Sequence, residues 1–282
     1  MRLYYSDPDL KKYIILLLIF ISFAAYSQNV TLGSWNIQNF GKSKNDDELA
    51  YIAKVVNKFD VIAIQEVVAG YGGSQAVARL ADELNRMGSK WDYVISNPTS
   101  SPTGSSKERY AFVWNTSKVK KNGTAWLEET YGLMIDREPY YCRFAVGRKT
   151  FTVANFHAVP KSKQPETEIK YFKFLPDLYP GDNLIFCGDF NLPQSHSVFN
   201  PLWKTGHTSA FRGQKTSLKQ KCVNGNCLAS EYDNFYFKAS GINVLRTGIV
   251  HFYQDFEDLR AARLISDHVP IYMQFSLDVI AK

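Results

Sequence analysis

The chain has 282 residues, of which 45% are hydrophobic and 21% are charged, and it carries a formal net charge of +6. This length allows one α/β domain with a full core, and the absence of a repeat period or low-complexity tract excludes a repeat or low-complexity protein. The modest positive charge is compatible with a polyanionic partner but does not require one.

The N-terminal segment predicts a secretory signal peptide over residues 1–27. Lys11 and Lys12 precede an apolar run over 13–24, and a small-residue end follows at 25–27. Such a run of about a dozen residues is short for a membrane span. An uncleaved anchor is the alternative. We therefore expect a mature chain of residues 28–282 that is secreted or periplasmic.

The four cysteines suggest one short disulfide bond. Cys222 and Cys227 bracket the turn sequence Val-Asn-Gly-Asn, so we expect a bridge across that loop. Closing so short a loop contributes roughly 2 kcal/mol. A zinc site is the competing interpretation, but no second Cys or His pair with suitable spacing lies nearby. Cys142 and Cys187 lie in apolar runs and are interpreted as buried free thiols.

Strands and helices are predicted to alternate along the chain. The predicted strands are 30–37, 60–64, 91–96, 110–114, 141–145, 151–157, 184–187, 233–237 and 271–275. Helices are expected after the cap residue Asn45, from Ser74, and from near Pro165 until Pro176 interrupts the pattern. This order predicts an α/β (α+β) fold, a four-layer sandwich of two packed mixed β-sheets flanked by helices.

Polar side chains that can bind a metal or transfer a proton lie at the ends of most of these strands. Two runs are the most informative: Gly188 to Asn191 follow the apolar stretch 183–187, and Ser266 to Pro270 follow 262–265, which we also interpret as a strand. An Asn or Asp after a strand is usually a turn residue. The whole set, however, can meet at one edge of two packed sheets. Its members are Asn36, Glu66, Glu108, His157, Asp189, Asn191, Asp233, Asp267 and His268.

This set of residues suits phosphoryl transfer. Glu66 and Asp267, with Asn36 as a neutral oxygen donor, form an oxygen-rich group suited to Mg²⁺. Two histidines, each oriented by its own carboxylate, supply a base for the attacking water and an acid for the leaving group. Asn191 is expected to donate to the non-bridging phosphate oxygens. Sequence does not decide which histidine is the base.

Five motifs in this order resemble those of the endonuclease/exonuclease/phosphatase superfamily. They are Trp35-Asn36-Ile37, Ile64-Gln65-Glu66-Val67, Asn155-Phe156-His157, Gly188-Asp189-Phe190-Asn191 and Ser266-Asp267-His268-Val269-Pro270. The resemblance covers nearly all of the mature chain. It implies metal-dependent hydrolysis of phosphate esters, with Asp189 in the catalytic group, but it does not identify the substrate.

Two further stretches resemble the deoxyribonuclease I branch, and they identify residues 28–282 as its catalytic domain. These stretches are Lys107-Glu108-Arg109-Tyr110 and Asp136-Arg137-Glu138-Pro139. The resemblance implies that Glu108 pairs with His157 and that Asp233 pairs with His268. It also implies that Arg137 contacts substrate phosphate; a surface salt bridge is the alternative for this arginine.

The chain also departs from that branch. Val68 stands where deoxyribonuclease I has a groove-binding Arg, and Ser106 stands where it has a Tyr, so its base and groove contacts are not carried over. The stretch 216–230 differs, so that family's calcium sites cannot be placed. Basic residues suited to phosphate contacts, or simply to solubility, are Lys161, Lys163, Arg212, Lys215, Lys219 and Lys221.

The sequence therefore predicts an exported, monomeric, Mg²⁺-dependent endonuclease with DNA as its substrate. The resemblance implies 5′-phosphate and 3′-hydroxyl ends, and Mn²⁺ or Ca²⁺ are alternative ions. The first alternative function is another phosphodiesterase or phosphatase of the superfamily, sphingomyelinase-like or inositol-phosphatase-like. The second is a non-catalytic binding protein, which the filled site positions disfavour.

Overall fold

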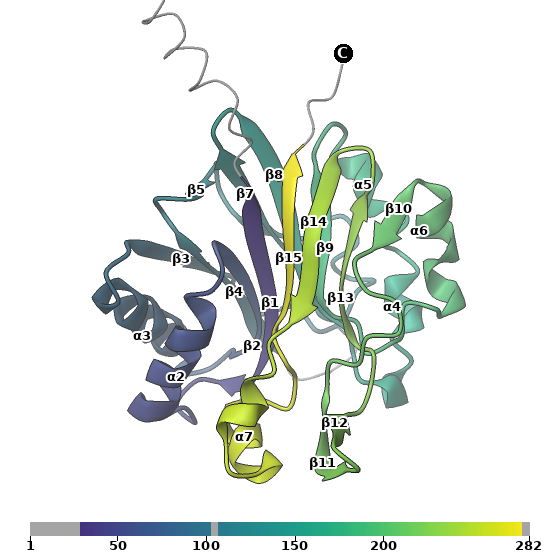
Figure 1. The fold of residues 1–282 in the computed structure, drawn as a ribbon. Helices are drawn as coiled ribbons and strands as arrows, with labels where there is room; N and C mark the ends of the chain where they lie inside the picture. Colours follow the sequence, from purple (N-terminus) through teal and green to yellow (C-terminus); the bar gives the residue numbers. More distant parts are fainter. Residues whose placement is uncertain (1–28, 103–106, 278–282) are drawn as a thin grey trace, which may run out of the picture.

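Two β-sheets packed face to face, with helices on both outer faces, form the fold in the computed structural model (Figure 1). The structure describes residues 29–102 and 107–277, so the predicted signal peptide lies outside it. Within those two ranges no helix is long and apolar enough to cross a membrane. The predicted four-layer sandwich is confirmed.

The first sheet has six strands in the order β14-β15-β1-β2-β4-β3. Their bounds are β1 Val30–Phe40, β2 Val61–Val68, β3 Trp91–Ile95, β4 Glu108–Asn115, β14 Ile242–Ile249 and β15 Ile271–Leu277. β1 and β2 are parallel, and the other pairs are antiparallel. β1 and β15 lie side by side at the centre of Figure 1, although they come from opposite ends of the chain.

The second sheet has seven strands, with β10-β13-β9-β8-β7-β5 in order and β6 also paired to β7. Their bounds are β5 Lys120–Lys121, β6 Trp126–Leu127, β7 Tyr140–Val146, β8 Lys149–His157, β9 Leu184–Asp189, β10 His207–Ser209 and β13 Asp233–Lys238. β8 and β9 are parallel. This parallel pair brings the C-terminal residues of both strands to the same edge of the sheet.

Helices cover the outer face of each sheet. α2 (Asp46–Val56), α3 (Gly73–Arg86) and α7 (Leu259–Ile265) pack on the first sheet through one apolar cluster. The short helices α4 (Glu166–Ile169), α5 (Leu175–Leu178) and α6 (Asn200–Lys204) pack on the second through another. The 3₁₀ turns are η1 (Lys161–Lys163), η2 (Ser197–Phe199) and η3 (Phe252–Asp255).

A third apolar cluster fills the space between the two sheets. Phe112 of the first sheet packs edge-on against Phe144 of the second, with ring centroids 5.7 Å apart. Cys142 and Cys187 lie in the same layer as free thiols, as predicted, and burial raises the pKa of Cys142 to about 12. These thiols are therefore protonated and unreactive near neutral pH.

The predicted disulfide joins Cys222 to Cys227 in the structure, with their Cα atoms 4.2 Å apart. It closes the hairpin of β11 (Leu218–Val223) and β12 (Asn226–Leu228), which projects from the molecule beside α7 in Figure 1. Asn224 and Gly225 form its tip with positive φ angles of 50° and 75°, which suits these two residue types.

Two sequence interpretations near the site are wrong. The stretch 262–265 belongs to helix α7 rather than to a strand, because Asp258 caps the helix at the backbone N–H of Ala261 (2.8 Å). Asn36 and Glu66 do not end their strands either. β1 and β2 continue to Phe40 and Val68, with irregular register after Asn36.

Candidate active site

Three of the predicted residues are direct neighbours across the second sheet. His157 ends β8 and pairs with Asp189, which ends β9, and Asp189 pairs in turn with Asp233, the first residue of β13. The sheet register therefore places an imidazole and two carboxylates in one row at its edge.

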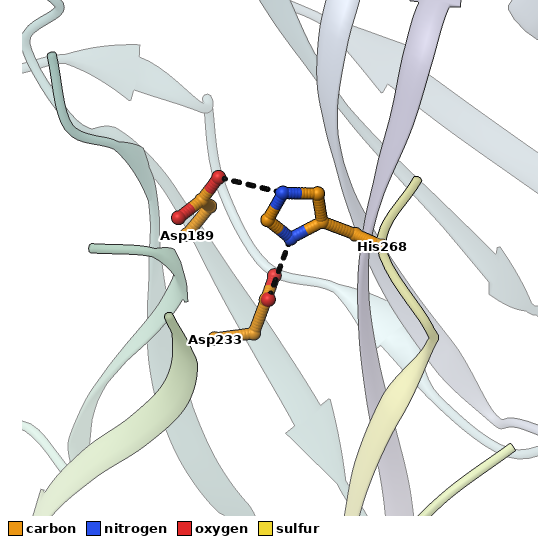
Figure 2. Close-up of side chains that lie close together, drawn as sticks. All are labelled: Asp189, Asp233 and His268. Atoms are coloured by element: carbon orange, nitrogen blue, oxygen red, sulfur yellow. Dashed lines mark hydrogen bonds and ion pairs between the residues drawn. The ribbon is translucent and has the colours of Figure 1, made fainter. Parts of the chain in front are cut away.

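Asp189 lies at the centre of this group. Its Oδ2 atom is 3.5 Å from Nε2 of His157 and 3.5 Å from Nε2 of His268. Figure 2 shows the second of these contacts. The two positive histidines and several hydrogen bonds outweigh burial, which alone would raise the pKa of Asp189, and hold that pKa below its usual value. Asp189 is therefore an ionised carboxylate that lies between two imidazole rings.

The close approach of β8 and β9 at this point depends on Gly188. Its φ is +135°, and a Cβ atom there would lie 1.8 Å from the carbonyl oxygen of Phe156. No other residue type fits that space and that backbone conformation. The Gly before Asp189 in the motif thus allows the aspartate to reach its position.

Asp233 contacts His268 on the side of the ring that faces away from Asp189. Its Nδ1 is 2.7 Å from Asp233 Oδ2, as Figure 2 shows, so its Nε2 faces Asp189. Asp189, Asp233 and His268 offer ligand-type atoms within 4.8 Å of one another. Burial lowers the pKa of His268, but the Asp233 and Asp189 carboxylates outweigh it and raise that pKa well above its ordinary value. The Thr216 hydroxyl donates to the same Asp233 oxygen at 2.6 Å and fixes its orientation.

His157 has an equivalent partner in Glu108. Its Nδ1 is 3.0 Å from Glu108 Oε2, and both side chains are almost fully buried. Burial and the nearby Arg137 lower the pKa of His157, yet Glu108 and Asp189 outweigh them and raise it. The pairs His157–Glu108 and His268–Asp233 both occur as the resemblance implied.

Arg137 contacts both members of the first pair. Its Nη1 is 3.0 Å from Glu108 Oε2 and 3.1 Å from His157 Nδ1, and its Nη2 donates to the carbonyl of Ala158. The side chain is buried, so the alternative of a surface salt bridge is wrong. It also lines a cavity of about 370 Å³ together with Glu66. Its Nε–H meets no acceptor among the residues the structure describes.

Asn36 and Glu66 come from the first sheet, and Asn36 contacts Asp189 of the second sheet. Asn36 Nδ2 donates to Glu66 Oε1 (3.0 Å) and to Asp189 Oδ2 (3.2 Å). Glu66 has a φ of +60°, and its Oε2 accepts from the backbone of Asn39. A left-handed non-glycine residue is a sparsely populated conformation that concentrates at functional sites.

These residues fit a divalent cation. The Oδ1 atom of Asn36 is buried and accepts no hydrogen bond from the residues that the structure describes. A buried carbonyl oxygen without a donor, beside the Glu66 carboxylate, is a donor set that suits a hard ion such as Mg²⁺. Asn36 and Glu66 could therefore hold a metal ion.

Asp267, which belongs to the last motif, is half-buried. Its Oδ2 is 3.4 Å from Arg263 Nη2, and its carbonyl accepts from the Leu218 N–H (2.7 Å). The charges of Asp267 and Glu66 both act on the buried Lys44, whose pKa burial nevertheless lowers. The two predicted metal carboxylates thus both lie near enough to the Lys44 ammonium group to act on its charge.

Asn191 lies at the edge of the group in a left-handed conformation, with φ of +51°. Its backbone N–H donates to Asp189 Oδ1 (2.9 Å), and its Nδ2 donates to the Ala158 carbonyl (2.9 Å). One amide hydrogen is therefore already used within the protein, and the second is the one available to a phosphate oxygen.

Sequence reasoning missed several supporting residues. Thr216 orients Asp233, and the hydroxyl of Tyr110 links the backbones of His157 (3.1 Å) and Arg137 (3.0 Å). Glu168 accepts from two loop amides nearby. Only Tyr110 belongs to a motif, Lys-Glu-Arg-Tyr. Glu168 lies in the helix predicted from near Pro165, where nothing marks its hydrogen bonds, and Thr216 lies in a stretch without a pattern.

Comparison with known proteins agrees with this geometry. The model of the Endonuclease/Exonuclease/phosphatase family matches residues 33–268, and the chain belongs to this family. It is similar to a deoxyribonuclease of Thioalkalivibrio sp. (28% identical, covering 93% of this chain and 74% of that protein). It is also similar to deoxyribonuclease gamma of Rattus norvegicus (30% identical, covering 72% and 67%). The chain is therefore a nuclease-like hydrolase of this family.

Solved structures share the fold at low sequence identity. A family protein from Bacteroides thetaiotaomicron aligns with a TM-score of 0.65 at 16% identity, covering 89% of this chain and 98% of that chain. A mannosyl-6-phosphatase of the same species aligns with a TM-score of 0.62 at 18% identity, covering 89% and 100%. At these identities the likeness concerns the fold alone.

Proposed function

We propose that this protein is an exported endonuclease that hydrolyses DNA phosphodiester bonds with the help of Mg²⁺. The observation that carries the proposal is the position of Asp189, with Oδ2 at 3.5 Å from the Nε2 atoms of both histidines. Similarity to deoxyribonucleases over most of the chain supports DNA as the substrate. Products with 5′-phosphate and 3′-hydroxyl ends follow from the same resemblance, and a monomer is expected.

The two histidines are proposed to move the protons. Each has its Nδ1 fixed by a carboxylate, so the two Nε2 atoms face the same space beside Asp189. One imidazole accepts the proton of the attacking water, and the other donates a proton to the leaving oxygen. Asp189 stabilises the imidazolium forms and orients both rings toward the phosphate.

Glu66, Asp267 and Asn36 would hold the metal ion, with Mn²⁺ or Ca²⁺ as alternatives to Mg²⁺. When bound, the ion would neutralise phosphate charge and stabilise the leaving oxygen. Arg137 and Asn191 are proposed to donate to the non-bridging phosphate oxygens. The place of Arg137 in the wall of the cavity that Glu66 also lines supports this role.

A plasmid-nicking assay with matched histidine variants tests the proposal. We expect the mature protein to nick supercoiled DNA in millimolar Mg²⁺ and to lose this activity with a chelator. His157→Ala and His268→Ala should each lower the nicking rate by about 10²- to 10⁴-fold, the usual contribution of general acid–base catalysis. DNA binding, measured by gel shift in chelator, should be retained.

His251→Ala is the matched control, because His251 is exposed and its side chain hydrogen-bonds only Tyr253 among the described residues. It should nick plasmid like the wild type. Intact plasmid at high protein concentration and in millimolar Mg²⁺ would contradict the proposal.

Hydrolysis of another phosphate ester is the alternative function, because the fold is shared with a phosphatase. Release of phosphate from sugar, inositol or lipid phosphates without any nicking of DNA would favour it.

Export is proposed from the signal-like N-terminus alone, and the Cys222–Cys227 bridge is compatible with an oxidising compartment. N-terminal sequencing of the protein recovered outside the cytoplasm should begin after Ser27.

A further inference from the structure

A cavity of about 420 Å³ lies beside the active site and has no part in the hydrolysis proposed above. One wall includes Met134, shortly before Arg137 in the chain, and another includes Val159 and Lys163, shortly after His157. Its volume falls in the range of small-molecule pockets, ~300–1,000 Å³. The cavity is thus formed by the two segments that also carry a catalytic histidine and the predicted phosphate-binding arginine.

Glu168 holds these two segments together at the base of the cavity. Its Oε2 accepts from the backbone N–H of Asp136 (2.8 Å), and its Oε1 accepts from that of Val159 (2.6 Å). The side chain is buried, so both hydrogen bonds are shielded from water. The walls are therefore fixed before a ligand binds.

Lys163 connects this cavity to the active site. It lines the 420 Å³ cavity and also the 370 Å³ cavity that includes Glu66, Glu108 and Arg137. A strand whose phosphate lies at Arg137 would pass Lys163 to reach the larger cavity. An ammonium group at this point is suited to a phosphate of the strand.

The lining combines an apolar surface with hydrogen-bonding groups. Met134 is 58% exposed at the cavity, and the adjacent Leu133 is 77% exposed. A methionine thioether makes favourable contacts with aromatic rings. Ser162, Gln164 and Thr167 add hydroxyl and amide groups. A nucleobase, with its flat apolar face and polar edge, matches both parts of this lining.

We propose that this cavity is a subsite for one nucleobase, that of a nucleotide adjacent to the cleaved phosphate. The inference rests on the proposed nuclease function and narrows its substrate. A base enters such a cavity only when it is unpaired and unstacked. The protein therefore cleaves single-stranded or locally unpaired DNA in preference to regular duplex.

Methyl NMR of methionine tests the subsite without any turnover. The sequence has four methionines. In the described part of the chain Met87 is exposed and directly follows α3, a helix that lies far from α4 in Figure 1, while Met273 is buried. With ¹³C-methyl methionine and chelator present, thymidine 5′-monophosphate should shift the Met134 signal saturably. The Met87 and Met273 signals should stay in place. Absence of a saturable Met134 shift would overturn the proposal.

Strand preference provides the second test. Met134→Ala should lower the ratio of kcat/KM for a single-stranded oligonucleotide to that for its duplex about tenfold, the order expected for losing one base contact. Met87→Ala should leave the ratio unchanged. An unchanged ratio in Met134→Ala would count against the subsite.

Two other outcomes separate the inference from its alternatives. If the protein cleaves no DNA at all, the nuclease proposal fails, while the methyl titration still reports on nucleotide binding. If vesicles of phosphatidylglycerol shift the Met134 signal and the nucleotide does not, the exposed Leu133 and Met134 contact lipid, and the nucleobase proposal is wrong.

Discussion

Single residues at the sheet edge determine whether the two histidines and Asp189 can come together. Asp189 reaches both histidines only because β8 and β9 approach closely at Gly188, where a Cβ atom would meet the Phe156 carbonyl at 1.8 Å. Glu66 and Asn191 also adopt left-handed conformations. Two residues of the site therefore have sparsely populated backbone conformations, which the packed sheets maintain.

Gly188→Ala should destabilise the protein by roughly 3 kcal/mol or more, because it adds a steric clash to an unfavourable φ. Chemical denaturation measures the change in the free energy of unfolding. Gly123→Ala is the control, since Gly123 also has a positive φ (81°) but its Cβ would contact nothing within 4 Å. It should cost only ~1 kcal/mol. Equal losses in the two variants would show that the Phe156 contact is unimportant.

For individual residues, the sequence motifs located the members of the site, and the structure brings most of them together. The pairs His157–Glu108 and His268–Asp233 were predictable from the resemblance to the deoxyribonuclease I branch, because no local pattern shows which carboxylate faces which histidine. Thr216 was not predictable, since its hydrogen bond to Asp233 spans 17 residues and no local pattern marks it.

At the level of secondary-structure elements, the buried polar pair Gln65 and Asn155 connects the two sheets next to the site. Gln65 of β2 donates to Asn155 of β8 (2.5 Å), and Asn155 donates to the carbonyls of Ile64 (3.0 Å) and Ala111 (3.2 Å). These hydrogen bonds cross the mainly apolar layer between the two sheets. They fix the position of β8, and with it His157, relative to β2, which carries Glu66.

Asn155→Ala should destabilise the protein by about 3 kcal/mol, because it leaves a buried donor and two buried acceptors unsatisfied. It should also lower nuclease activity by displacing His157 relative to Glu66. Thermal unfolding and plasmid nicking measure the two effects. Asn243→Ala, on the exposed part of β14, is the control and should change neither. A fully active, fully stable Asn155→Ala variant would disprove the coupling of the sheets.

The longer elements were predictable, and the short or irregular ones were not. Helix α2 follows its Asn45 cap as expected, whereas the short stretch 262–265 predicts a strand where the structure has helix α7. Four residues, of which three are apolar, do not distinguish the helical period from the strand period. The bulge at Glu66 could not be predicted from the sequence, because it depends on pairing between β1, β2 and β4 rather than on local residues.

For the whole molecule, the dependence of stability on pH reflects where ionisable groups are buried. His207, which begins β10, is buried beside Thr205, with its Nδ1 2.8 Å from the hydroxyl. Burial, helped by the charge of Lys238, lowers its pKa to about 4. Between pH 6.5 and 4 the unfolded chain binds a proton there that the folded chain does not, so stability falls as the pH falls through this window.

His207→Gln should remove this contribution. A pKa difference of one unit corresponds to ~1.4 kcal/mol, and we expect a contribution of roughly 2 kcal/mol from His207. The variant should lose less stability than the wild type between pH 7 and pH 4 in urea denaturation. His251→Gln, at an exposed site, should follow the wild type. Parallel pH profiles for His207→Gln and the wild type would refute the assignment.

The residues of the site come from both sheets. Asn36 and Glu66 lie in the first, while His157 and Asp189 lie in the second, and they meet only after the sheets have packed. A newly synthesised chain that has not yet folded therefore has no assembled active site. If such a chain leaves the cytoplasm unfolded, the genome of the cell that makes it is never exposed to the finished enzyme.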